Sequence, residues 1–206
     1  MTFTISMIVY PIWMQTSLGY TATWAGVMLS PTGILPLILM PLIGHRLQRW
    51  DVRWVITFGV LLIVTAYYLH AQSSTDSPPW YFITTRLLTG AAMPFAFMPL
   101  MVVSLVGLPQ DKLASATGIF NFVRMLSGSL GTAAGITLWD QRTIYHRSRQ
   151  AENISEDSPQ YQQTLELLLQ RLPDEQAAMA ALDAAVSTQA STLAMNDLFY
   201  LCTALL

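Results

Sequence analysis

Long apolar blocks separated by short polar connections make up most of the chain. Five blocks approach or exceed the length of about 20 residues that a helix needs to cross a hydrocarbon core. They lie near 1–17, 24–44, 54–70, 81–107 and 116–139, and a sixth block opens near residue 193. The apolar residues are continuous, unlike the spaced stripes of an amphipathic helix or a half-buried strand, so the pattern predicts membrane spans.

The spans are expected to be helices. In lipid every backbone amide needs an internal partner, and the chain lacks the regular alternation of a transmembrane β-barrel. The connections near 18–23, 45–53, 71–80 and 108–115 are short, so successive helices should run antiparallel as neighbours. We therefore predict an all-α fold, a polytopic transmembrane helix bundle of about five complete spans and a truncated sixth.

A polar region interrupts the apolar pattern and carries most of the acidic residues. The predicted organisation is a transmembrane bundle of five spans at 1–139, a polar periplasmic loop with helical segments at 140–192, and the start of the final span at 193–206. Within the polar region, Pro173-Asp174-Glu175 predicts a helix start, with Pro at the first position and acidic side chains facing the positive end of the helix dipole. The Ala-rich stretch that follows has no helix breaker and leads toward the sixth span.

Positive charge predicts the orientation of the bundle. Arg46, Arg49, Arg53 and Lys112 lie in two loops that share one side of the membrane by parity, whereas the loops on the other side between the first four spans have no Lys or Arg. The positive-inside rule places the charged pair of loops in the cytoplasm. Three arginines that follow the fifth span lie on the opposite side and weaken this charge bias.

Composition supports the membrane assignment and excludes other classes. Hydrophobic residues are 53% of the chain and charged residues 11%, against about 25% charged in an ordinary soluble domain. A net charge of −2 with scattered Lys and Arg offers no field for nucleic acid. No phosphate-binding loop, nucleophile elbow or zinc-ligand spacing occurs, so we expect neither an enzyme nor a cofactor or metal site. Cys202 is expected to be a small buried residue.

Two arginines, Arg86 and Arg124, lie inside apolar blocks. A charge at the bilayer centre costs at least about 3 kcal/mol and usually marks function. Arg86 is near the start of its block, so it either extends to the headgroups or faces a translocation pathway. Arg124 is nearer mid-span, where reaching the headgroups is harder. None of the five blocks contains Asp or Glu, so the partners must be carbonyls, water, an anionic substrate or a carboxylate elsewhere.

One predicted helix face joins a polar pair to a row of small residues. Asn121 and Arg124 are followed on the same face by Gly128, Gly131 and Gly135. Small residues let a second helix approach closely, so the face is either a packing seam or the wall of a pathway. A seam explains the glycines but not the guanidinium, so we predict that Arg124 and Asn121 face a central cavity.

Several motifs occur in the order and spacing of a known family. They are Pro11 to Gly44, Phe97-Met98-Pro99-Leu100, Gly107-Leu108-Pro109, Asn121-Phe122-x-Arg124-x-x-x-Gly128-Ser129-x-Gly131-Thr132 and Asn196-Asp197-Leu198-Phe199. In them the chain resembles the EmrB branch (EmrB/QacA subfamily) of the fourteen-span drug:proton antiporters of the major facilitator superfamily, over nearly its whole length except the polar loop. The resemblance implies a partial major-facilitator fold, with the blocks as the ninth to thirteenth spans and the fourteenth truncated after Leu206.

The resemblance also implies a function. An EmrB-type exporter carries out proton-coupled efflux of hydrophobic drugs from the inner membrane of Gram-negative bacteria, with a periplasmic adaptor protein and an outer-membrane channel. The partners implied are therefore hydrophobic small molecules, protons, the lipid bilayer and these two proteins. The polar loop is a candidate contact for the adaptor. The alternatives are a non-transporting membrane scaffold or sensor and an inactive gene remnant.

Further site residues follow from the same resemblance. Gln15 joins Arg124, Asn121 and Arg86 as a candidate for the translocation pathway. The turn from Gly44 to Arg53 resembles the family's cytoplasmic gating loop, with Gly44, Arg46 and Asp51 as its candidate residues. Gln48 stands where that pattern has Asp, so the turn departs from the family's pattern at this position.

Overall fold

The structure, a computed structural model, describes residues 2–47, 49–153, 162, 168–169 and 174–206. Helix is the only regular secondary structure in these residues, which confirms the predicted all-α fold. The helices are α1 (Thr2–Thr16), α2 (Ala22–Leu47), α3 (Val52–His70), α4 (Pro79–Leu105), α5 (Gln110–Asn153) and α7 (Glu175–Ala204).

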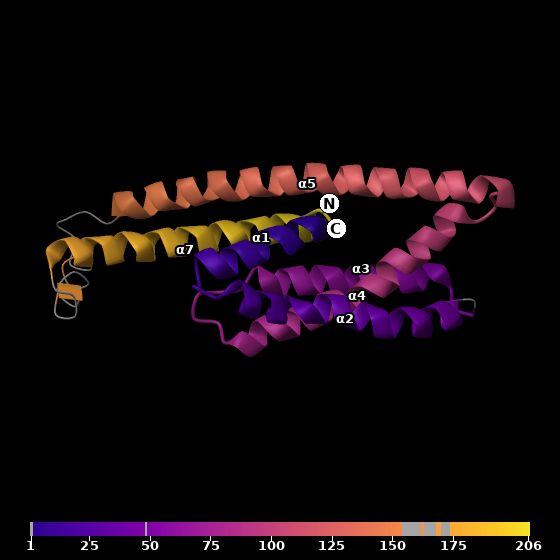
Figure 1. The fold of residues 1–206 in the computed structure, drawn as a ribbon, viewed down its shortest axis with the longest axis horizontal. Coiled ribbons are helices and arrows are strands. Elements are labelled where there is room, and N and C mark those ends of the chain that lie inside the picture. The colour runs from indigo at the N-terminus through magenta and orange to yellow at the C-terminus, as the bar shows by residue number, and fades with distance from the viewer. Residues whose placement is uncertain (1, 48, 154–161, 163–167, 170–173) are drawn as a thin grey trace.

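The helices form two groups that α1 connects (Figure 1). In one group α4 packs against both α2 and α3, and in the other the long helices α5 and α7 lie side by side. Helix α1 contacts α2, α5 and α7, and α3 also reaches α7. The first helix of the chain is therefore central to the packing of the whole bundle.

Three helices of the described residues are long and apolar enough to cross a membrane. They are Ala22–Arg46, Val52–His70 and Pro79–Leu105, which correspond to the second, third and fourth predicted spans. Helix α1 has only 15 residues, and α5, with 44 residues, carries many polar side chains, so neither meets the same criterion. The chain is a multi-pass helical membrane protein, and the spans at 1–17 and 116–139 stay predictions.

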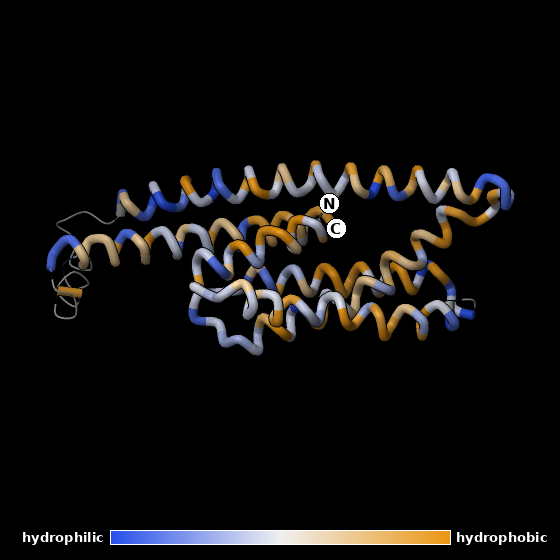
Figure 2. Tube along the Cα trace, viewed as in Figure 1, coloured by the Kyte–Doolittle hydropathy of each residue, from blue (hydrophilic) through white to orange (hydrophobic). Residues whose placement is uncertain are grey.

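A long helical hairpin extends beyond the rest of the bundle. Helix α5 continues past residue 139 to Asn153, and α7 begins at Glu175, where the Asp174 carboxylate caps it by accepting a hydrogen bond from the Ala177 amide at 2.7 Å. Pro173, predicted as the first helical position, lies outside the described residues. Figure 2 shows that the projecting end of the hairpin is more hydrophilic than the bundle. The domain limits at 139 and 193 stay predictions, and both fall inside helices.

Polar contacts along the hairpin hold α5 against α7. Arg147 pairs with Asp183 at 2.7 Å near the projecting end. Closer to the bundle, Asp197 accepts from His146 at 2.8 Å and lies 3.6 Å from Arg142. The arginines that weakened the predicted orientation are thus partly engaged in ion pairs between these two helices.

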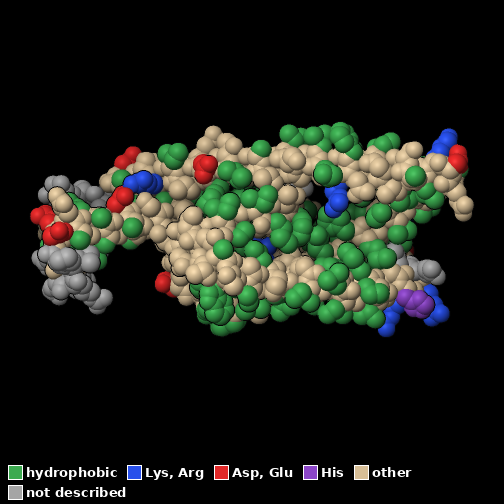
Figure 3. Space-filling model, in the orientation of Figure 1, with side chains coloured by type: hydrophobic (Ala, Val, Ile, Leu, Met, Phe, Trp, Pro, Cys, Tyr) green, Lys and Arg blue, Asp and Glu red, His purple; other side chains and the backbone are tan. Residues whose placement is uncertain are grey.

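Aromatic rings from four helices fill the centre of the bundle. Tyr10 of α1 meets Phe82 of α4 at 6.2 Å and Phe199 of α7 at 5.9 Å between ring centroids, and Tyr67 of α3 lies 5.8 Å from Phe199. Cys202 is buried and free, as expected. Figure 3 shows hydrophobic side chains spread over the surface of the bundle, the arrangement expected of a protein that faces lipid.

Helices α2 and α4 cross closely because Gly90 has no side chain. A methyl group there would lie 2.7 Å from the carbonyl oxygen of Pro31 and 3.0 Å from the Cα of Thr32. Both neighbours are backbone atoms of α2, which cannot turn aside as a flexible side chain can. The crossing therefore depends on glycine at this position.

We expect Gly90→Ala to destabilise the protein by about 1–3 kcal/mol, because the two backbones must move apart. The measurement is the midpoint of thermal unfolding in detergent. Gly26→Ala is the matched control, since a methyl group at Gly26 in α2 would meet no atom of another helix within 4 Å. A midpoint for Gly90→Ala equal to that of the control would show that the crossing is looser than described.

Candidate functional site

The two arginines of the apolar blocks lie in different surroundings, and Arg86 is completely buried. Its Nη1 donates to the Ser6 hydroxyl at 3.3 Å, and its Nη2 donates to the Ser6 carbonyl at 3.1 Å. The guanidinium carbon also lies 3.9 Å from the centroid of the Tyr10 ring, a cation–π contact. The side chain thus points from α4 to α1, which excludes the alternative that it extends outward to the headgroups.

Other buried polar groups surround Arg86. We define the buried polar cluster as Ser6, Tyr10, Tyr67, His70, Arg86 and Thr89. Within it, His70 Nε2 lies 3.4 Å from the Thr89 hydroxyl. Among the described residues, no carboxylate contacts Arg86, and its Nε, the two tyrosine hydroxyls and His70 Nδ1 lack a partner in hydrogen-bonding geometry. Buried polar atoms without a partner are uncommon in folded proteins, which sets this cluster apart from the apolar core around it.

Arg124 instead borders an open cavity between α1 and α5. Its Nη2 donates to Asn121 Oδ1 at 3.3 Å, so the structure brings these two predicted residues together. The cavity has a volume of about 690 Å³, and Figure 3 shows a Lys or Arg side chain at a hollow between α5 and the helices beneath it. We call this space the α1–α5 cavity; it is lined by Phe3, Thr4, Met7, Ile8, Arg124, Met125, Gly128, Ser129, Thr132 and Ala133.

The chemistry of the α1–α5 cavity suits a solute that is mostly apolar with one polar or anionic group. Its volume is within the range of about 300–1,000 Å³ typical of ligand pockets. Methionines supply adaptable apolar walls, and hydroxyls such as Ser129 and Thr132 supply hydrogen bonds. Among the described residues that line the cavity, Arg124 is the only charged one, so the cavity is positive.

The predicted row of glycines lies against α1. A methyl group at Gly128 would lie 3.3 Å from the Thr4 hydroxyl, and one at Gly135 would lie 2.9 Å from the Ile5 side chain. Gly131 is buried as well. The same face of α5 therefore includes both a packing seam and, at Arg124, a wall of the α1–α5 cavity.

The remaining predicted residues lie elsewhere. Gln15 is exposed, and its side-chain amide donates to the Pro11 carbonyl of its own helix at 3.1 Å. In the α2–α3 turn, Asp51 caps α3 by accepting from the Arg53 amide at 3.0 Å, while Arg46 is exposed. Gly44 faces Met98, whose methyl carbon would be 2.6 Å from an added Cβ. Gln48 lies outside the described residues.

Two histidines have a larger role in the packing than the sequence indicated. His70 is fully buried, and its ring lies tilted against Tyr10, with ring centroids 4.8 Å apart. His146 bonds Asp197 across 51 residues of sequence. Asp197 belongs to a motif that carries the family resemblance, but the sequence has no signal that would pair it with a histidine so far away.

The sequence profile of the Major Facilitator Superfamily matches residues 1–141. The multidrug export protein EmrB of Escherichia coli K12 is 31% identical over 199 residues, which are 95% of this chain and 38% of that protein. EmrB of Haemophilus influenzae is 32% identical over 95% of the chain and 39% of its own length. The fatty acid resistance protein FarB of Neisseria gonorrhoeae is 29% identical, over 97% and 39% respectively. The chain thus spans less than two fifths of the length of these relatives.

We expect Ser6→Ala to destabilise the protein by about 1–3 kcal/mol, because the buried guanidinium of Arg86 loses a hydrogen-bond acceptor. Thermal unfolding in detergent measures the change. Ser104→Ala is the control, since the Ser104 hydroxyl is exposed and bonds the Leu100 carbonyl of its own helix. An equal midpoint in both variants would mean that the Ser6 hydroxyl contributes nothing to holding Arg86.

Proposed function

The chain belongs to the major facilitator superfamily, and from this premise we propose that it forms part of an EmrB-type transporter that exports hydrophobic toxic compounds. The names of its relatives, multidrug export and fatty acid resistance proteins, support this class of function. The observation that carries the proposal is the α1–α5 cavity with Arg124 on its wall. In this proposal the cavity is part of the translocation pathway.

The lack of a counter-ion at Arg124 among the described residues supports a role of this side chain in binding solute. Among the described residues it forms no ion pair, and its hydrogen bond is to the neutral Asn121. A guanidinium in an apolar environment is costly without a counter-ion, and such residues in membrane proteins usually serve function. We infer that Arg124 and Asn121 bind the polar group of a hydrophobic substrate or a carboxylate from another part of the transporter.

Proton coupling is the proposed source of energy. Membrane-embedded carboxylates commonly carry the protons in such transporters. Helices α1, α2, α3 and α4 contain neither Asp nor Glu. The proton-carrying carboxylate is therefore proposed to lie outside these four helices. Arg86, which binds α1 inside the bundle, is proposed to shape the pathway by positioning that helix.

The α5–α7 hairpin is the proposed contact with a periplasmic adaptor. The hairpin projects beyond the other helices, its end is polar, and Arg147 and Asp183 pair on it at 2.7 Å. A polar projection outside the lipid is suited to binding a second protein. In this proposal the protein lies in the inner membrane and delivers substrate through the adaptor to an outer-membrane channel.

We expect Arg124→Ala in the protein produced in an exporter-deficient bacterium to abolish resistance to hydrophobic toxic compounds while membrane insertion stays normal. Loss of the only charge in the cavity lining removes the group that binds the polar end of the solute. Resistance and substrate-stimulated proton flux are the measurements. Lys112→Ala is the control, because Lys112 is exposed on the same helix and does not line the cavity. Normal resistance in Arg124→Ala would remove the assignment.

Deletion of residues 145–175 should abolish co-purification of the adaptor while the protein still inserts into the membrane. The deletion removes the projecting end of the hairpin and leaves α1 to α4 untouched. Affinity purification from membranes that contain both proteins measures the interaction. The charge exchange Arg147→Asp with Asp183→Arg, which keeps opposite charges at these two positions, is a control for the fold of the hairpin. Undiminished adaptor in the deletion variant would refute this contact.

A further inference from the structure

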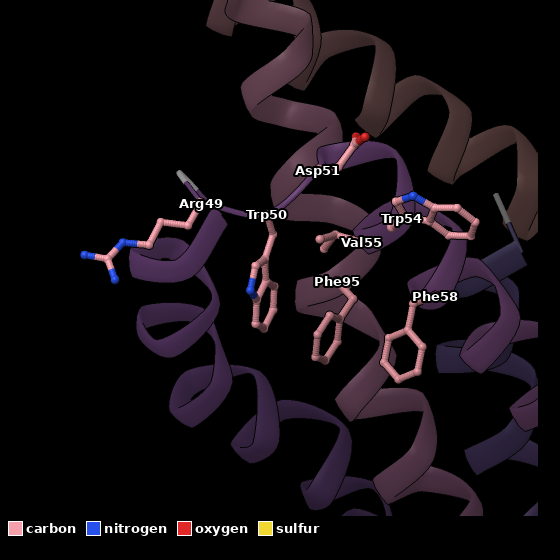
Figure 4. A pocket seen from close by; sticks show the side chains of 7 residues that line it. All are labelled: Arg49, Trp50, Asp51, Trp54, Val55, Phe58 and Phe95. Atoms are coloured by element: carbon pink, nitrogen blue, oxygen red, sulfur yellow. The ribbon is translucent and has the colours of Figure 1, made fainter.

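A second large cavity lies at the turn between α2 and α3, and Arg124 is not among its lining residues. Four aromatic side chains, Trp50, Trp54, Phe58 and Phe95, line it together with Arg49 and Asp51, and its volume is about 630 Å³ (Figure 4). We call it the aromatic hollow. None of its lining residues belongs to the α1–α5 cavity or to the buried polar cluster.

The aromatic hollow opens to the outside of the bundle. Trp54 is 75% exposed, and Trp50 and Phe58 are about half exposed. Phe58 of α3 and Phe95 of α4 form an edge-to-face pair with centroids 5.1 Å apart, and the two packed rings form an apolar wall of the hollow. Because α3 is one of the helices able to span a membrane, these exposed rings lie where acyl chains would reach them.

Positive charge gathers at one end of the aromatic hollow. Arg46, Arg49 and Arg53 are all exposed around the turn, and the Asp51 carboxylate accepts from the Arg53 amide as the cap of α3. Figure 4 shows the Arg49 side chain at the rim, directed away from the row of rings. A ligand with a negative group at headgroup depth would place that group next to Arg49. The apolar part of the same ligand would lie against the rings. Tryptophans at such a boundary are typical of the membrane interface.

We propose that the aromatic hollow binds one anionic diacyl phospholipid. The phosphate is held at the rim by Arg49, with the Trp50 indole beside it, and an acyl chain lies along Trp54, Phe58 and Phe95. Charge complementarity favours this occupant over a neutral apolar solute, because Arg49 lines the rim and the Asp51 carboxylate beside it is engaged as the cap of α3. The exposure of the rings along a spanning helix favours a lipid over a peptide segment. The bound lipid would brace the α2–α3 turn against α4.

The test uses the protein purified in mild detergent, with dioleoylphosphatidylglycerol and dioleoylphosphatidylcholine as probes in native mass spectrometry. We expect phosphatidylglycerol to be retained in preference to phosphatidylcholine. Arg49→Gln should lower its affinity about tenfold, the effect of one charge-assisted contact. Arg46→Gln is the matched control, since Arg46 is exposed at the same end and does not line the hollow. Each variant must keep the unfolding midpoint of the original protein.

The apolar part of the site has its own measurement. Phosphatidylglycerol with brominated acyl chains should quench the fluorescence of Trp54. The contribution of Trp54 is the quenching measured in the original protein minus the quenching measured in Trp54→Phe. Trp24, which is 59% exposed at the other end of α2, is the control position as Trp24→Phe. Three results would each overturn the proposal. They are an equal loss of phosphatidylglycerol affinity in Arg49→Gln and Arg46→Gln, equal retention of phosphatidylglycerol and phosphatidylcholine, and no quenching of Trp54 fluorescence. The last result would mean that another part of the protein or a solute fills the hollow.

Discussion

The contact of Arg86 with α1 is the interaction on which the rest of the arrangement depends. A fully buried guanidinium needs acceptors, and Ser6 supplies both a hydroxyl and a carbonyl while the Tyr10 ring covers its face. Removal of these partners would leave a charge in an apolar interior, which is strongly unfavourable. The contact therefore holds α1 against α4, and through α1 it connects the α2–α4 group to the α5–α7 pair.

The position of α1 in turn creates the α1–α5 cavity. Gly128 and Gly135 allow α1 to lie close to α5 over part of its length. Toward Arg124 the same two helices enclose a space of about 690 Å³. The two arginines thus act on opposite walls of the cavity. Arg86 binds α1, which forms one wall, and Arg124 lies on α5, which forms the other.

The outer parts of the molecule follow a different physical rule. Along the hairpin, ion pairs between α5 and α7 add to the packing of the two helices, with Asp197 and Asp183 bound to side chains of α5. At the α2–α3 turn, exposed rings and arginines meet at one end of a spanning helix. Both regions combine polar and apolar chemistry in the way that is expected where a membrane protein leaves the hydrocarbon layer.

The sequence by itself determined the class of fold and the position of most helices. Long apolar blocks in lipid have no alternative to helix, so α2, α3 and α4 begin and end within three residues of the predicted limits. The proximity of Asn121 to Arg124 also follows from helical spacing alone. Only the tertiary structure decided that Arg86 turns inward and that His146 meets Asp197. A side chain's direction and its distant partners depend on which helices pack together, and helical periodicity within one segment carries no information about neighbours in another.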